Sequence, residues 1–158
     1  MIPDFVIVDG IQWPLLPPGI YDSTMDEIFT RYAITPWRLQ LFYGLKKGID
    51  HLFSCGCRQV FLDGSYITQK LLPADYEVIW DMQFVDGDML DPIFLDFSNG
   101  RYNQKQKYFG EYFPDTIEAG SGKPFLDFFQ QDKDTGSPKG IIRVTNYLPE
   151  KGETNDLE

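Results

Sequence analysis

The segment QVFLDGSYITQKLLPADYEVIWD, residues 59–81, holds the pattern from which we predict the fold and the functional site. A first strand is predicted over residues 58–62, because the apolar run Val60-Phe61-Leu62 is typical of a strand that is covered on both faces. Asp63-Gly64-Ser65 predicts a tight corner, followed by one or two helical turns that end at Pro73. A second strand is expected from Asp75 to Trp80.

This second strand opens with two carboxylates, Asp75 and Glu77. Residues two apart on a strand point to the same face, so both side chains are expected to reach one place. The backbone N–H groups of the Gly64-Ser65 corner are expected to face a phosphate there. Hard oxygen ligands beside a phosphate site are what Mg²⁺-assisted phosphoryl or nucleotidyl transfer needs. The alternative is structural: a plain turn, a capping Asp75 and an exposed Glu77.

The length of 158 residues predicts one domain with a real core. A hydrophobic content of 42% and an aromatic content of 16% argue against disorder of the whole chain. We expect a proline-rich N-terminal arm over residues 1–22 that packs on the core, a domain over residues 23–148 and a flexible acidic tail over residues 149–158. Residues 4–9 are expected to form a short strand within the arm.

The net charge of −10 argues against a protein whose general surface grips duplex DNA. No apolar stretch approaches the roughly eighteen residues of a membrane span, and the first residues do not form a signal peptide, so a cytoplasmic protein is expected. His51, Cys55 and Cys57 offer three possible metal ligands, whereas a closed zinc site usually has four. Buried thiols at a helix end are therefore expected here.

Capping signals predict two helices, over residues 24–32 and 35–53, and place Arg38, Lys46 and Lys47 on a solvated face. Residues 93–97 are expected to form a third strand or a helical turn. Further predictions are basic residues interleaved with aromatic ones over 101–113, a helix over 124–131 and a last strand over 141–145. For Lys105 and Lys107 a solvated edge is favoured over a phosphate or RNA contact. The fold class is thus α/β (α+β), a small mixed sheet with flanking helices.

The corner and the acids together resemble the signature of the nucleotidyltransferase superfamily. In this chain the signature reads Leu62, Gly64-Ser65, a spacer over residues 66–74 and then Asp75-Tyr76-Glu77-Val78. Further stretches resemble a family of small uncharacterised bacterial and phage proteins related to minimal nucleotidyltransferases, over most of residues 1–144. They are residues 2–5, 16–20, 56–57, 62–65, 70, 95–101 and 138–140.

The resemblance implies a minimal nucleotidyltransferase fold and a set of roles. Gly64, Ser65 and Lys70 would contact the phosphates of a nucleoside triphosphate, while Asp75 and Glu77 would hold Mg²⁺. A third carboxylate on a neighbouring strand would complete the catalytic site, with Asp96 as the candidate and Asp81 in reserve. The implied reaction moves a nucleoside monophosphate to a hydroxyl group on a protein or RNA acceptor.

A binding protein on the same scaffold is the alternative function. An antitoxin-like protein or a phage-encoded inhibitor would use its acidic surface to occupy a basic site on a protein partner. The excess of negative charge suits such a partner.

Overall fold

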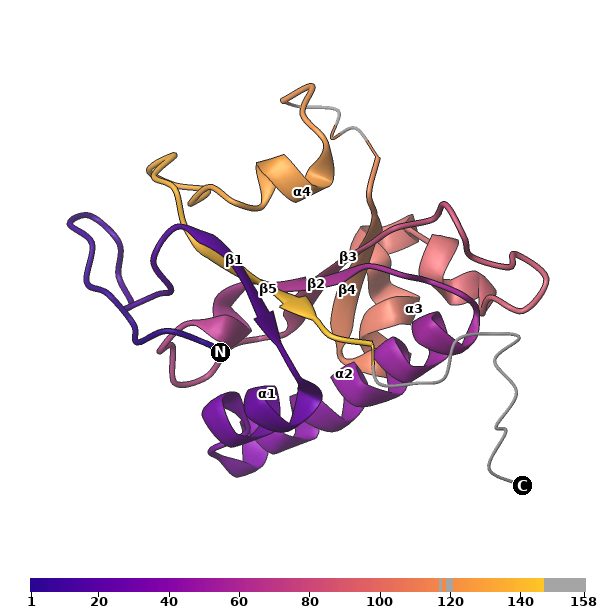
Figure 1. Ribbon diagram of the computed structural model, residues 1–158, viewed down its shortest axis with the longest axis horizontal. Helices are drawn as coiled ribbons and strands as arrows, with labels where there is room; N and C mark the ends of the chain where they lie inside the picture. Colours follow the sequence, from indigo (N-terminus) through magenta and orange to yellow (C-terminus); the bar gives the residue numbers. More distant parts are fainter. Residues whose placement is uncertain (117, 119–120, 147–158) are drawn as a thin grey trace.

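The computed structural model describes residues 1–116, 118 and 121–146, which form a five-stranded mixed sheet with helices on both faces (Figure 1). The order of strands across the sheet is β1-β5-β2-β3-β4. The predicted fold class, a small mixed sheet with flanking helices, is confirmed. The strands are β1 (Gly19–Ser23), β2 (Val60–Asp63), β3 (Tyr76–Trp80), β4 (Gly110–Pro114) and β5 (Gly140–Val144).

Both predicted helix starts before β2 are present. Thr24 caps α1 (Met25–Tyr32) by accepting a hydrogen bond from Glu27 N at 3.1 Å, and Thr35 caps α2 (Pro36–Ser54) by accepting one from Arg38 N at 3.1 Å. The remaining helices are α3 (Ser98–Tyr108), α4 (Phe125–Phe128) and the 3₁₀ turns η1 (Ser65–Ile67) and η2 (Pro92–Leu95). None of the helices in the described residues is both long and apolar enough to cross a membrane.

The two faces of β3 pack against different layers. Tyr76, Val78 and Trp80 are buried in the main core, which includes apolar residues of α1 and α2. Ile79 points to the opposite face, where it joins a smaller cluster with the phenyl rings of the α4 segment. Figure 1 shows α1 and α2 on one side of the sheet and α4 on the other. Asp75 and Glu77 are in phase with Ile79, so they belong to the α4 face.

The arm differs from its prediction. Residues 4–9 do not form a strand, because Val6 makes only an isolated bridge with Leu15. The end of the arm instead adds β1 to the sheet edge, parallel to β5. The tail predicted over residues 149–158 lies outside the described residues.

Residues 98–114 form α3 and then β4, which the sequence analysis did not assign. Asn99, Gly100 and Arg101 have positive φ angles of 51°, 62° and 61°, so a left-handed turn precedes the regular part of α3. The buried Gln104 fixes the arrangement: its Nε2 donates to Ile93 O at 3.1 Å, and its Oε1 accepts from Tyr112 N at 2.7 Å. These are long-range contacts, which local sequence patterns do not reveal.

Candidate functional site

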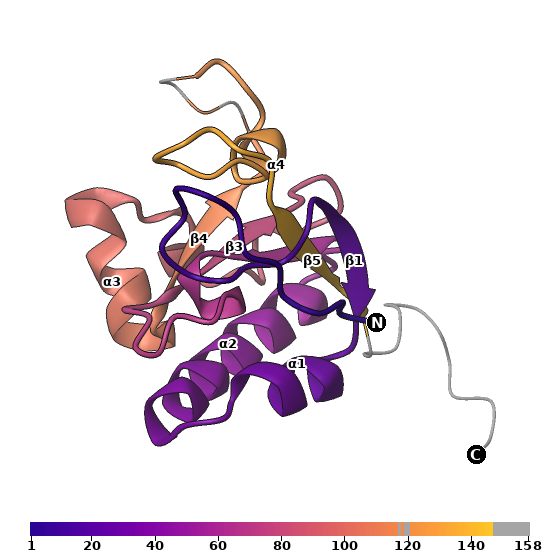
Figure 2. The same cartoon turned by 90° about the vertical axis from the view of Figure 1, so that its left-hand side faces the viewer.

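A cleft of about 520 Å³ opens on the α4 face of the sheet. Five of the six predicted site residues line it, namely Gly64, Ser65, Lys70, Asp75 and Glu77. Its other walls come from the arm, the end of α4 and the loop that leads to β5. Figure 2 shows the arm, in indigo, crossing in front of the sheet and below α4.

Three carboxylates form a row across the sheet in this region. Asp63 on β2 pairs with Glu77 on β3, and Glu77 pairs with Glu111 on β4. Neighbouring strands lie about 4.8 Å apart, and directly paired residues point to the same face. Asp75 precedes Glu77 by two residues, so a fourth carboxylate lies on this face.

The carboxylate row, meaning Asp63, Glu77 and Glu111, is costly to ionise together with Asp75. Burial, with a smaller effect of Asp63, raises the pKa of Glu77 to about 8. Burial, together with the charge of Glu111 and a hydrogen bond to it, raises the pKa of Asp75 to about 6. Below pH 8 the site therefore retains protons that a bound cation would replace.

Lysine side chains stand at both ends of this group. Lys105 Nζ lies 3.2 Å from Glu111 Oε1 and 3.9 Å from Asp75 Oδ2, and its side chain is 40% exposed. Lys139 Nζ lies 3.1 Å from Asp63 Oδ1, and Asp63 is fully buried. Burial raises the pKa of Asp63 despite this ion pair. Lys105 is therefore an exchangeable cation, whereas Lys139 is held in place beside the cleft.

Asp96, the predicted third carboxylate, does not line the cleft. It follows η2 and accepts hydrogen bonds from Ser98 N at 3.1 Å and Asn103 Nδ2 at 2.7 Å, so it organises the start of α3. The reserve residue, Asp81, accepts from Gln83 N at 2.9 Å after the end of β3.

Glu111 is the acid that β4 places beside Glu77, and it is not among the site residues predicted from the sequence. The available signal was the strand-like alternation of Gly110-Glu111-Tyr112-Phe113, which the preceding basic and aromatic residues obscured. Lys139 lay within a stretch that carried the family resemblance, but it had no predicted role.

The Gly64-Ser65 corner depends on glycine because of its backbone conformation. Gly64 has a φ of 92°, and a Cβ at this position would lie 3.4 Å from Glu77 Cγ and Cδ. The corner therefore packs in contact with Glu77, and the positive φ is what favours glycine there. The backbone N–H of Gly64 partly opposes the effect of burial on the pKa of Asp63.

Arg38 holds the loop after the corner, and its predicted place on a solvated face is wrong. The side chain is buried, and its guanidinium donates to Tyr66 O at 2.7 Å and Thr68 O at 3.0 Å. It also donates to the carbonyl oxygens of Lys70 and Tyr32. Arg38 consequently fixes the backbone that presents Lys70 to the cleft.

The donor set suits a hard divalent cation. No three His, Cys, Asp or Glu side chains of the described residues are already gathered as a metal site. Asp75, Glu77 and Glu111 nevertheless offer carboxylate oxygens, the ligands that Mg²⁺ prefers. The ammonium group of Lys105 lies between Asp75 and Glu111, so this position already stabilises positive charge. Displacement of the exposed Lys105 side chain would free both carboxylates for a metal ion.

A family model matches residues 11–145, which include the carboxylate row, the corner and Lys139; its description is Family of unknown function (DUF6932). The chain belongs to the DUF6932 family. The match carries no link to nucleotidyltransferases. No curated protein and no solved structure matches the chain.

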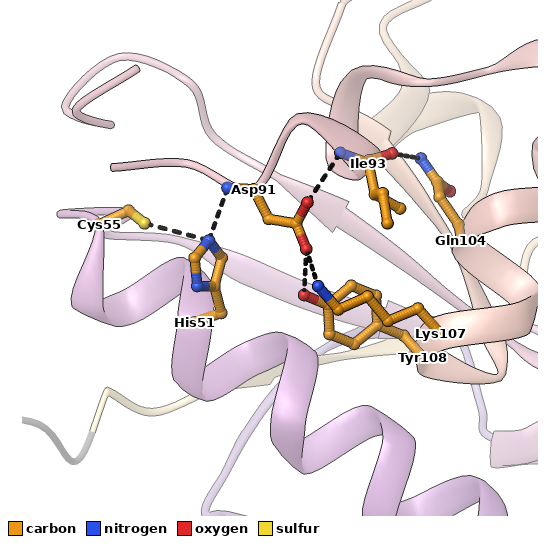
Figure 3. Close-up of polar contacts among 7 residues, drawn as sticks. All are labelled: His51, Cys55, Asp91, Ile93, Gln104, Lys107 and Tyr108. Carbon is orange, nitrogen blue, oxygen red and sulfur yellow. Dashed lines mark hydrogen bonds and ion pairs between the residues drawn. The ribbon is translucent and has the colours of Figure 1, made fainter. Parts of the chain in front are cut away.

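This DUF6932 protein has a second polar cluster, between α2 and α3 (Figure 3). His51 Nε2 accepts a hydrogen bond from Asp91 N at 2.8 Å, and Cys55 Sγ lies 3.4 Å from the same nitrogen. The Asp91 carboxylate accepts from Lys107 Nζ at 2.5 Å and Tyr108 Oη at 2.7 Å. Burial opposes ionisation of Asp91, but these hydrogen bonds lower its pKa to about 2. Cys55 and Cys57 are both buried, as predicted.

We predict that His51 contributes stability that is lost in acid. Burial lowers the pKa of His51 from the usual 6.5. The positive charge of Lys107 lowers this pKa further, whereas the negative charge of Asp91 partly opposes the shift. The unfolded chain therefore takes up the proton first as the pH falls, and protonated Nε2 no longer accepts from Asp91 N. At pH 8 the free energy of unfolding of wild type should exceed that of His51→Gln by about 1 kcal/mol. This difference should shrink toward pH 5. Urea denaturation at both pH values measures this stability difference, and a difference that stays constant with pH would contradict the prediction.

Proposed function

We propose that this DUF6932 protein is a Mg²⁺-dependent nucleotidyltransferase, which moves a nucleoside monophosphate from a nucleoside triphosphate to a hydroxyl group of a protein or RNA acceptor. The observation that carries the proposal is that Asp75 and Glu77 line one cleft with the Gly64-Ser65 corner, while Glu111 is paired with Glu77 on the neighbouring strand at the edge of this group. The sequence resemblance supports the proposal separately, because it implies two acids two residues apart and a third acid on a neighbouring strand; here Asp75 directly precedes β3, Glu77 lies within β3 and Glu111 lies on β4.

In this proposal Asp75, Glu77 and Glu111 hold the metal ion, and Ser65, Lys70 and Lys139 contact the phosphates. Bound Mg²⁺ would neutralise charge that develops on the transferred phosphoryl group. The acceptor oxygen forms a bond to the α-phosphorus while the bond to pyrophosphate breaks. The acceptor proton passes to Glu111, and pyrophosphate leaves along the side of the cleft that contains Lys70 and Lys139.

The raised pKa values support a functional explanation of the carboxylates over a structural one. Burial raises the pKa of Glu77 to about 8, and burial with Glu111 raises that of Asp75 to about 6, so ionisation of both destabilises the folded protein. Apolar or amide side chains would fill the same space without this cost. Strongly shifted groups that face a cleft are typical of catalytic and metal sites.

We predict that Glu111→Gln lowers label transfer from α-labelled ATP by about 100-fold or more, because the variant loses one metal ligand and the proton acceptor. Transfer is measured to the macromolecules of a nucleotide-depleted cell extract. Asp96→Asn is the matched control: it neutralises another acid outside the cleft and should retain transfer within about twofold.

Two results would reject the proposal. One is equal transfer by wild type and Glu111→Gln. The other is the absence of both transfer and calorimetric binding of Mg²⁺-ATP by wild type, which would favour a binding protein that acts through its acidic surface on a protein partner.

A further inference from the structure

The cleft has an apolar wall that the phosphate and metal chemistry does not use. Ile11, Trp13 and Leu15 of the arm line it, together with Phe128 and Phe129 at the end of α4. A site for phosphates and a metal ion alone needs no such wall. Its presence indicates a ligand with a flat or apolar part as well as a charged one.

The arm presents Trp13 from a backbone that is tied down on several sides. Val6 and Leu15 exchange backbone hydrogen bonds of 2.7 and 3.0 Å, which close the loop that contains Trp13. Gln69 N donates to Pro14 O at 2.9 Å, so the arm is also joined to the loop that carries Lys70. The partly exposed indole is therefore held next to the cleft.

Trp13 is also close to a group that the proposed function assigns to phosphate binding. Lys70 Nζ lies 5.4 Å from the centre of the indole ring, a cation–π distance. In a nucleoside triphosphate only the ribose separates the base from the phosphates. One such molecule can thus place its phosphates at Lys70 and its base near Trp13.

We propose that Trp13 stacks on the base of the nucleoside triphosphate, so that the arm forms the base subsite of the cleft. The inference rests on the proposed function and names the part of the substrate that this wall recognises. Stacking is tolerant of sequence because every base has a π-face, and it is stronger for the larger purine rings. The arm therefore favours purine over pyrimidine nucleotides without direct hydrogen-bond readout.

The test compares two ligands that share the phosphates but not the base. Calorimetry with Mg²⁺ measures the affinities for ATP and for inorganic tripolyphosphate. Trp13→Leu should weaken ATP binding about tenfold or more, because stacking of one base contributes roughly 1–3 kcal/mol and 1.4 kcal/mol corresponds to tenfold. It should leave tripolyphosphate binding within about twofold, since Lys70, Lys139 and the carboxylates are retained.

Two further variants keep the result interpretable. Trp13→Phe retains an aromatic face and should lose less ATP affinity than Trp13→Leu. Tyr43→Leu is the matched control: this tyrosine is 60% exposed on α2, which covers the opposite side of the sheet, and its loss should not change either affinity (Figure 1). Wild type should also bind ATP more tightly than CTP.

Several results would overturn the inference. If Trp13→Leu weakens ATP and tripolyphosphate equally, or weakens neither, the base does not stack on Trp13, although the phosphate and metal site remains. Equal wild-type affinities for ATP, CTP and tripolyphosphate would also reject it, without any variant. Binding of none of these ligands by wild type would reject both the inference and the proposed function.

Discussion

Glu77→Gln is expected to stabilise the folded protein at alkaline pH and to abolish nucleotidyl transfer. Burial and the neighbouring Asp63 raise the pKa of Glu77 from 4.5 to about 8, so the folded state binds its proton more tightly than the unfolded chain does. Stability from this group is greatest below pH 4.5 and is lost as the pH rises to 8. Glutamine keeps a similar shape and removes the ionisation.

The stability of Glu77→Gln relative to wild type should therefore grow with pH. Above pH 8 we expect the melting temperature of the variant to exceed that of wild type by about 3 °C or more, which corresponds to roughly 1 kcal/mol. Near pH 4 the difference should be small, because the Glu77 carboxyl is then largely protonated in both the folded and the unfolded state. Asp88→Asn, which removes an exposed acid, should change little at either pH.

The same variant tests the function. If Glu77 holds the metal ion as proposed, its replacement should lower transfer from α-labelled ATP by about 100-fold or more. Wild type should also gain thermal stability from Mg²⁺-ATP, and the variant should gain less. A gain in stability with a loss of activity is expected of a functional residue. Retained transfer, or a loss of stability at alkaline pH, would contradict this account of Glu77.

The position of Asp75 and Glu77 could be predicted because β3 has a strict alternation. Tyr76 and Trp80 enter the main core, so the residues in phase with Glu77 had to point to the other face. This inference needed only local sequence. It gave the correct face for both acids and placed the corner next to them.

Glu111 could not be assigned in the same way, because its position depends on long-range contacts. Glu111 follows α3, a helix that begins with a left-handed turn. The buried Gln104 of this helix fixes the strand that carries Glu111. Neither feature has a regular hydrophobic period. Asp96 was the more visible acid in the sequence, but its hydrogen bonds to Ser98 and Asn103 give it a local role at the start of α3.

Arg38 shows how a buried charge escapes prediction. Charged residues on a helix usually face solvent, and nothing near Arg38 in the sequence indicates otherwise. Its partners are the carbonyl oxygens of Tyr66, Thr68 and Lys70, about thirty residues later in the chain. The loop after the corner folds around the guanidinium, so the burial of Arg38 depends on tertiary structure.

We expect Arg38→Met to lower the free energy of unfolding by about 3 kcal/mol or more. The methionine fills much of the space, but it leaves the carbonyl oxygens of the loop without donors, at roughly 1–3 kcal/mol for each group that stays buried. Arg38→Lys should recover part of the loss, because an ammonium group cannot reach all four carbonyls of a planar guanidinium. Lys47→Met, on the exposed face of the same helix, should cost about 0.5 kcal/mol or less.

Arg38 should also affect ligand binding, because it positions the backbone that carries Lys70. We expect Arg38→Met to weaken tripolyphosphate binding at a temperature where the variant is still folded, while hydrogen exchange of the Thr68 and Gln69 amides becomes faster. Urea denaturation, calorimetry and hydrogen exchange measure the three effects. A purely structural role in the core would lower stability without selective exposure of this loop. Unchanged stability would mean that water replaces the guanidinium at the carbonyl oxygens, and the loop would then not depend on Arg38 for its place beside the carboxylate row.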